Sequence, residues 1–211
     1  MHPKQGTDAA LAMAMGHVVL KECYVDRRVP YFDDYLRRFT DSPMLVKLVA
    51  RTLPDGRQVL VPDRYLRASD LGAAGQEAAA GANNADWKTL ACDAAGRVVV
   101  PHGSIGFRWG PDGRGDAGRW NLEAREAGEG AEVSLVLSAL ELTDAATETA
   151  QVAFPYFAGQ ATEHFTANPQ AGDVLVRGVP ARRLSLTGAT GTEDALVATV
   201  FDLLLAPYGV A

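Results

Sequence analysis

Three consecutive residues near the start of the chain, Gly6, Thr7 and Asp8, have the types and the spacing to hold an anion or a nucleotide. They precede an apolar, alanine-rich run whose composition favours a helix. Amides at the start of a helix lack intrahelical acceptors, and a neighbouring glycine lets a phosphate approach closely. The two oxygens of Asp8 also suit the paired donors on a purine edge. This turn is the candidate binding site.

The same residues fit a helix start that binds nothing. Thr7 or Asp8 would then cap the helix, because a side-chain oxygen there accepts a hydrogen bond from an amide of the first turn. On pattern alone this is the commoner explanation of such a turn. The helix predicted to continue towards Glu22 is apolar on all sides, so we expect it to be buried in something larger than its neighbours in this chain.

A second helix is predicted to begin at Pro30, where the missing N–H costs nothing, and to end within 40–43. Asp33 and Asp34 stand four residues before Arg37 and Arg38. This spacing predicts ion pairs on a solvated face rather than an anion site. Between the two helices, residues 23–29 are expected to form a connection.

The remaining pattern is mainly that of short strands and turns. Predicted strands cover 44–49, two runs around the turn at 54–56, a hairpin of 87–91 with 98–100, an alternating run at 133–137, and 179–186 with 195–200. A surface loop is expected at 72–85, an aromatic corner at 154–157, and a final helix from 202 to 206 that Pro207 ends. Helix, helix and strand in this order fit an α/β layer.

Composition excludes several functions. A net charge of −6 and a sequence pI near 5.2 argue against a nucleic-acid surface. No apolar run is long enough to span a membrane, and no secretory leader opens the chain. The four His and two Cys lack metal-ligand spacing, so no metal site is expected from this chain alone. Cys23 and Cys92 are interpreted as reduced thiols in a cytosolic protein.

Two other pairs invite a chemical interpretation and do not support it. Glu163 and His164 are adjacent, and neighbours in a strand point to opposite faces, so they cannot share one proton. The glycines from Gly103 to Gly106 neither follow a strand nor open a helix, which excludes a dinucleotide-binding loop. His17, at the end of the first helix, is expected to be a core residue or a partner of a helix dipole.

Several blocks, in order along nearly the whole chain, resemble the catalytic alpha subunit of respiratory membrane-bound nitrate reductase, in the molybdopterin oxidoreductase (dimethyl sulfoxide reductase) superfamily. The blocks are KQGTDAALAMAMGH, YFDDYLRRFTDSPMLV, NNADWKT, GSIGFRWG, WNL at 120–122, FPYF and EHF. The chain therefore resembles an internal fragment of that subunit. Its fold class would be α/β, or α+β for the fragment alone: part of a doubly wound domain with a β-rich hairpin insertion. The expected division is 1–50 in the cofactor-binding domain, 51–178 in the insertion and covering loops, and 179–211 back in the α/β domain.

The resemblance implies a function for the parent protein. It implies two-electron reduction of nitrate to nitrite at a molybdenum-bis(molybdopterin guanine dinucleotide) centre, with electrons from quinol through iron–sulfur clusters. Gly6, Thr7 and Asp8 match the family's guanine-dinucleotide-binding turn. The molybdenum ligand and the cluster ligands would lie outside this chain, so no catalytic residue is assigned to it and it is expected to be inactive alone. Implied partners are the rest of the alpha subunit, an iron–sulfur beta subunit and a membrane gamma subunit, with the complex peripheral on the cytoplasmic membrane.

Two other functions stay open. The chain could be an interaction module derived from this family that binds a partner and no cofactor. It could also be a stand-alone binder of guanine nucleotides that uses the turn from Gly6 to Asp8. Calorimetry with guanosine nucleotides separates the second from a fragment, because a fragment without the rest of the cofactor cage should bind them very weakly.

Overall fold

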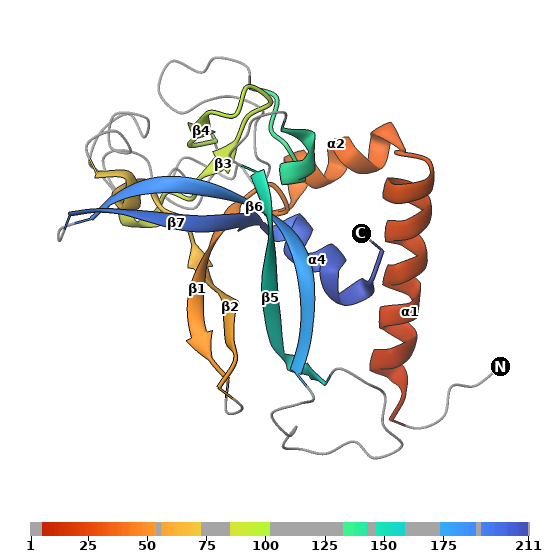
Figure 1. Cartoon of the computed structure of the whole chain (residues 1–211). Coiled ribbons are helices and arrows are strands. Elements are labelled where there is room, and N and C mark those ends of the chain that lie inside the picture. Colours follow the sequence, from red (N-terminus) through yellow and green to blue (C-terminus); the bar gives the residue numbers. More distant parts are fainter. Residues whose placement is uncertain are drawn as a thin grey trace.

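The structure, a computed structural model, describes residues 6–53, 56–72, 85–101, 133–142, 147–158, 174–188 and 191–210. It is an α+β arrangement of a small barrel with helices on one side (Figure 1). The helices are α1 (Asp8–Leu20), α2 (Pro30–Phe39) and α4 (Val200–Tyr208). The barrel strands are β1 (Leu45–Thr52), β2 (Gln58–Tyr65), β5 (Thr147–Ala158), β6 (Val174–Gly188) and β7 (Gly191–Thr199).

The five strands close in the order β1-β2-β5-β6-β7, with β1 and β7 paired. All neighbours are antiparallel except β2 and β5, which meet in parallel through Leu60 and Val152. Closure removes the exposed edges that an open sheet would carry. Alternate residues point inwards, and Leu48, Val152 and Val179 are buried within one apolar cluster of the barrel.

The first hairpin, β1 with β2, is formed by a turn that neighbouring residues alone predict. Leu53 donates its amide to the carbonyl of Arg57, and Gly56 donates to the carbonyl of Leu53. Gly56 has φ +85°, a conformation that suits glycine. The turn predicted at 54–56 therefore joins β1 to β2, although Pro54 and Asp55 themselves lie outside the described residues.

Short elements cover one end of the barrel. They are the 3-10 turns η2 (Ala68–Leu71), η3 (Ala85–Trp87) and η5 (Ala139–Glu141), and a two-stranded hairpin of β3 (Ala91–Cys92) and β4 (Val98–Val99). The second hairpin was expected here, but of its predicted first strand, 87–91, only residue 91 lies in β3. Leu66, Leu90 and Val100 are fully buried beneath them, in a cluster that also includes Val197 of β7.

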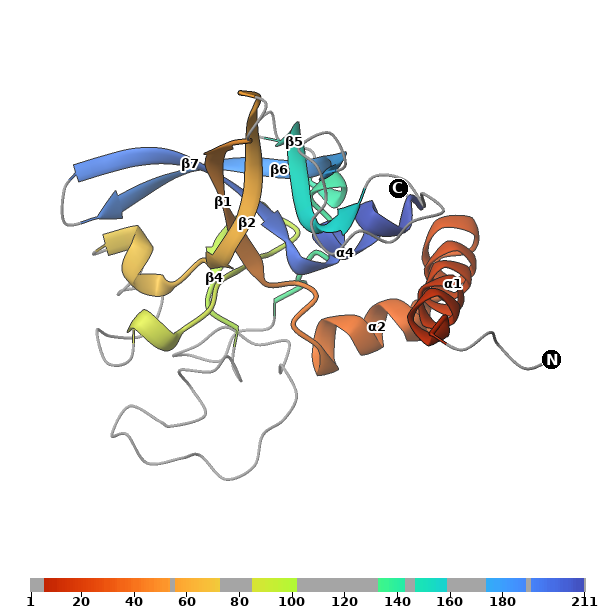
Figure 2. The same cartoon turned by 90° about the horizontal axis from the view of Figure 1, so that it is seen from below.

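Helix α4 connects the barrel to the other helices (Figure 2). Ala206 and Leu203 contact the barrel cluster. On its other side Phe201 and Leu205 pack with Leu20, the last residue of α1, and with Tyr24, which follows α1. Thr199 caps α4, because its side chain accepts a hydrogen bond from the amide of Asp202 at 3.0 Å. The position of α1 therefore depends on packing against α4.

Four local expectations are corrected. The first helix does not end before Cys23: it continues as a π-helix, η1 (Lys21–Asp26). The final helix begins at Val200, and Pro207 is accommodated inside it, in the last turn. The run 133–137 is no strand; it forms one isolated bridge, Asp93 to Leu135, and Val136 is buried together with its neighbours. The residues 154–157 form no corner, because β5 runs through them.

The β5 strand tolerates a proline because its pairing with β6 is irregular at that point. The register shifts between Phe154 and Ala158. Proline cannot donate to a ladder and is found in sheets at bulges and edges. Expectations for 103–106, for Glu163 and His164, and for most of 72–85 fall outside the described residues. Within the described residues, no helix has the length and apolar character that a membrane span requires.

Candidate functional site

The predicted turn lies at the open end of α1. Gly6 has φ +80°, and a Cβ built on it would meet no atom within 4 Å. Gly6 and Asp8 are exposed, and Thr7 is partly buried. Thr7 occupies the capping position but its side chain makes no capping hydrogen bond, so that part of the sequence prediction is wrong. The turn is open to solvent, and the first amides of a 13-residue helix face it.

Helix α1 is held near its C-terminal end by α4. The His17 ring nitrogen Nδ1 lies 2.9 Å from the carbonyl oxygen of Tyr208. Gly16 is the point of closest approach: a Cβ there would lie 2.7 Å from the hydroxyl of Tyr208. His17 therefore contacts the last turn of α4, where the carbonyls of a helix are left without intrahelical donors. His17 therefore makes a structural contact between two helices, and its expected role as a dipole partner stays a prediction.

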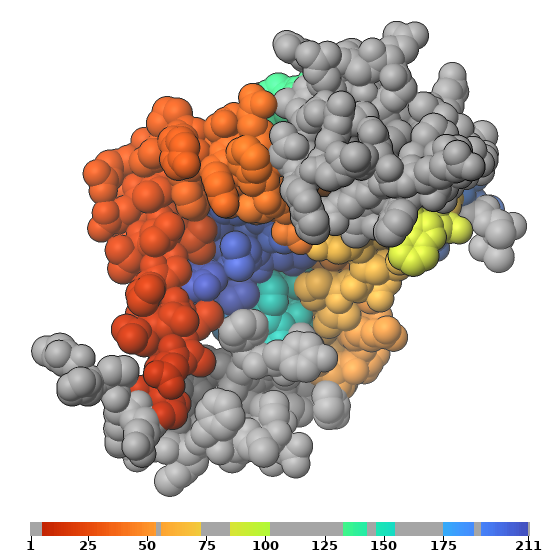
Figure 3. Space-filling view, turned by 180° about the vertical axis from the view of Figure 1, so that it is seen from behind, coloured from red at the N-terminus to blue at the C-terminus, as the bar shows by residue number. Residues whose placement is uncertain are grey.

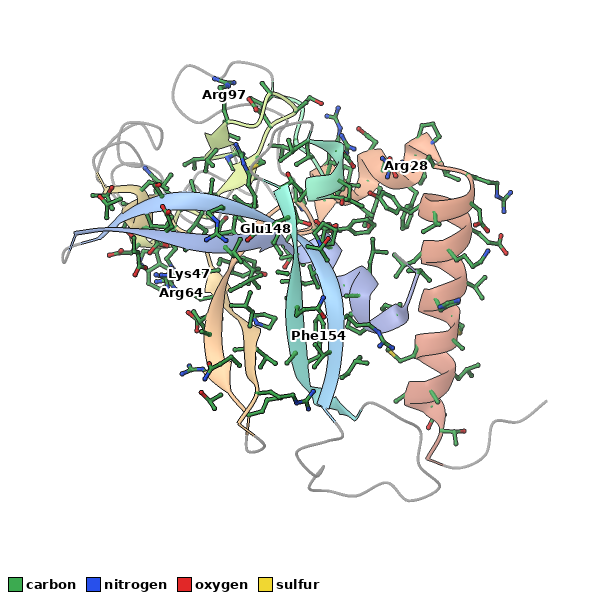
Figure 4. All side chains as sticks on the ribbon, in the orientation of Figure 1. Arg28, Lys47, Arg64, Arg97, Glu148 and Phe154 are labelled. Carbon is green, nitrogen blue, oxygen red and sulfur yellow. The ribbon has the colours of Figure 1, made fainter. Side chains whose placement is uncertain are left out.

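A charged cluster that the sequence did not predict lies at the other end of α1 (Figure 4). Glu141 of η5 accepts hydrogen bonds from Arg37 of α2 at 3.0 Å and from Arg28 at 3.4 Å. The Arg28 guanidinium also lies 4.1 Å from the centre of the Tyr24 ring. Asp33 is 4.0 Å from Arg28. Of the two ion pairs expected at a spacing of four, only Asp34 with Arg38 forms, at 2.6 Å.

The cluster borders a shallow depression of about 330 Å³, lined by Arg28, Pro30, Asp33, Asp34 and Arg37. The Asp33 Oδ1 and Arg37 Nε atoms are buried without a hydrogen-bond partner among the described residues. Arg28 has φ +49°, which is rare for a residue other than glycine. Sequence could not find this cluster, because Glu141 is 104 positions from Arg37.

Asp202, a buried residue at the start of α4, links this helix to the charged cluster. It is 2% exposed, and its carboxylate accepts a hydrogen bond from the amide of Ala139 at 2.9 Å. Burial raises the pKa of Asp202 to about 6, while hydrogen bonds from Ser138, Ala139 and Thr199 oppose the increase. Asp202 thus holds η5, and with it Glu141, against the start of α4.

Comparison with known proteins covers almost the whole chain. It is 50% identical over 209 residues to the respiratory nitrate reductase 1 alpha chain of Escherichia coli, covering 99% of this chain and 15% of that one. Its identity to the nitrate reductase alpha subunit of Mycobacterium tuberculosis is 40% over 208 residues, 98% of this chain and 14% of that protein. The chain is homologous to one segment of the nitrate reductase alpha chains. No family model matches it.

The chain spans about 15% of the length of the curated relatives that it matches. Identity at this level over the full chain confirms the resemblance to respiratory nitrate reductase. Among the described residues of the segment, no three His, Cys, Asp or Glu side chains are grouped so as to hold a metal ion. The turn and the charged cluster lie at opposite ends of α1 and form no single site (Figure 1).

The raised pKa of Asp202 predicts a pH dependence of the segment's stability. Its folded pKa, about 6, exceeds the usual 3.8, so the folded state binds the proton more tightly. This stabilisation is complete below pH 4 and is lost as the pH rises through 6. A shift of this size corresponds to about 3 kcal/mol. Asp202→Asn should flatten the profile of unfolding free energy between pH 4 and 6, measured by urea titration.

A matched control for that experiment is Asp34→Asn on the surface of α2, where the carboxylate is exposed. This control should leave the profile between pH 4 and 6 unchanged. An Asp202→Asn variant with the same pH profile as the unmodified chain would contradict the assignment.

Proposed function

We propose that this chain is a segment of the catalytic alpha subunit of a molybdenum-dependent respiratory nitrate reductase. The parent would reduce nitrate to nitrite with electrons that arrive from quinol through iron–sulfur clusters. The observation that carries the proposal is 50% identity over 99% of the chain to an alpha chain of this kind. The catalytic metal and its ligands would belong to other segments of the parent.

Within the parent, the chain would contribute to a doubly wound molybdopterin-oxidoreductase domain. In this proposal residues 1–50 and 179–211 lie in the cofactor-binding domain and 51–178 in a β-rich insertion. The contact between His17 of α1 and Tyr208 of α4 supports the pairing of the first and last of these ranges. The barrel draws strands from all three ranges, since β1 pairs with both β2 and β7.

Gly6, Thr7 and Asp8 would hold the guanosine end of a molybdopterin guanine dinucleotide. Their geometry fits that group: Gly6 leaves open space beside the backbone, and Asp8 presents an exposed carboxylate. The amides of the first turn suit the phosphates, and the carboxylate suits the paired donors of guanine. When bound, the cofactor would supply the two-electron chemistry. The residues of this chain would bind and orient its nucleotide end.

The turn can be tested in a chimeric alpha chain, in which this segment replaces the matching 209 residues of the Escherichia coli protein. Asp8→Ala should reduce the guanosine monophosphate released per polypeptide by acid hydrolysis about ten-fold or more. A hydrogen bond to a charged group contributes about 1.5–3 kcal/mol, and two would be lost. Gly6→Val should act in the same direction by filling the open side of the turn.

The control for the turn is Asp34→Asn, since Asp34 is an exposed carboxylate on α2. It should leave the nucleotide content unchanged. Full nucleotide content in the Asp8→Ala chimera would remove the turn from the cofactor site and favour the interaction module.

The assembly of the parent is part of the same proposal. It would join the rest of the alpha polypeptide with an iron–sulfur beta subunit and a membrane gamma subunit, on the cytoplasmic side of the membrane. Co-purification of the chimera with tagged beta subunit, compared with the unmodified alpha chain, tests this. A folded, cofactor-loaded chimera that fails to bind the beta subunit would separate cofactor binding from assembly.

A further inference from the structure

The outer side of α1 carries an apolar surface far wider than one helix contact needs. Only the side formed by Met13, Gly16, His17 and Leu20 faces the protein. Leu11, Met15, Val18 and Val19 are 48%, 61%, 51% and 46% exposed. Ala10, Ala12 and Ala14 are exposed between them. Figure 3 shows α1, in red, along one edge of the molecule.

We define the outer arc of α1 by seven exposed apolar residues, which in order around the helix are Ala10, Ala14, Val18, Leu11, Met15, Val19 and Ala12. The exposed Asp8 lies on the same side of the helix, in its first turn. At about 100° per residue these positions cover about 200° of the circumference. No charged residue lies in α1 after Asp8. A helix with apolar residues on this much of its surface is typical of the interior of a larger protein.

The width of the arc indicates cover on more than one side. A helix that packs on one side only needs an apolar stripe of about 100°. A second copy of this chain pairing through α1 would therefore leave about half of the outer arc in water. The curated relatives extend far beyond the matched segment, which is only 15% of the length of the first of them. A larger body of polypeptide is available to enclose the helix from two sides.

We propose that the outer arc of α1 is enclosed on two sides by further residues of the same nitrate reductase alpha polypeptide. This inference rests on the proposed function. The ion pairs that follow the arc support an apolar partner: Lys21 pairs with Asp26, and Glu22 with Arg27, each at 2.6 Å, so these four side chains present no unpaired charge to a partner. Enclosure would also fix the direction in which the turn at Gly6 opens.

The test places a cysteine at two well-separated positions of the arc. Ala14→Cys and Val19→Cys lie about 140° apart around the helix. Each is made in the 211-residue chain and in the chimeric alpha chain purified without other subunits. Maleimide labelling rates are read at each site by peptide mass spectrometry. Leu20→Cys, at a position 6% exposed, is the protected reference in both proteins.

We expect both arc sites to label rapidly in the 211-residue chain and at least one hundred-fold more slowly in the chimera. Rapid labelling at both sites in the chimera would overturn the inference. Protection of one site only would also overturn it and would indicate a single helix contact. Protection that appears only when beta subunit is added would assign the arc to a subunit interface instead.

The inference can fail on the isolated chain as well, without a folded chimera. Sedimentation of the 211-residue chain over a range of concentrations should show no stable dimer. Both cysteines should label rapidly at every concentration. A stable dimer that protects both cysteines would show that a second copy encloses the arc. Failure of the proposed function is read separately: protected arc sites together with full nucleotide content in Asp8→Ala would retain the enclosure and reject the turn as the cofactor site.

Discussion

Phe201→Ala should lower the free energy of unfolding by about 3–5 kcal/mol, the range found when a fully buried aromatic residue is truncated. Phe201 is 0% exposed and is among the largest fully buried side chains. Its ring meets the Tyr24 ring edge to face, with 4.5 Å between centroids, a geometry that adds about 0.5–1.5 kcal/mol beyond the buried area. The variant would leave a cavity where α4 meets the residues that follow α1.

The matched control is Leu204→Ala, three residues further along α4, where the side chain is 42% exposed. It should cost less than about 1 kcal/mol, because little apolar area is lost. Both variants are compared by urea unfolding followed by circular dichroism. The assignment of Phe201 as the central contact between α4 and the first helices fails if the two variants cost the same.

Sequence was sufficient where structure depends on neighbouring residues. The start of α2 at Pro30 and the turn at Gly56 follow from proline and glycine chemistry. The pair of β6 and β7 was predicted from two β-rich runs joined by a short turn, and β6 proved longer at both ends than the predicted 179–186. These features involve contacts within a few residues, which local propensity records.

Closure of the barrel could not be predicted, because it depends on distant pairings. Leu60 meets Val152, and Leu45 meets Thr199. Strand register is set by such contacts and by the shared core, neither of which a local pattern contains. The doubly wound domain expected from the resemblance stays a proposal, and the structure adds a five-stranded barrel that was not foreseen.

The candidate sites also differ in how far apart their residues lie in the sequence. Gly6, Thr7 and Asp8 are adjacent, so their composition could be interpreted directly, and their role stays a prediction. Arg28, Arg37 and Glu141 come together only in the fold. The buried Asp202 was expected to begin a helix, but its bond to Ala139 could not be anticipated. Sequence identifies a site well only when its residues are contiguous.

Purified alone, the 211-residue chain should form no nitrite from nitrate, even from cells that make molybdenum cofactor. The turn at Gly6 would contact only the guanosine end of the dinucleotide, and the resemblance places the molybdenum ligand outside the chain. A few contacts at one end of a large cofactor cannot offset the cost of ordering it. The assay is nitrite formation with reduced viologen as electron donor, under strictly anaerobic conditions, with the chimeric alpha chain as the active reference.

Any nitrite formation by the isolated chain must be tested for its dependence on molybdenum. Protein made in cells grown with tungstate in place of molybdate provides the control, since activity that survives this exchange does not depend on molybdenum. Molybdenum-dependent turnover that stays with the chain through gel filtration would contradict the proposal, because the metal site would then have to lie within these 211 residues. Among those described, the structure groups no three acidic, histidine or cysteine side chains that could form one. Activity in the chimera and its absence in the isolated chain would together assign the missing metal site to the remainder of the alpha polypeptide.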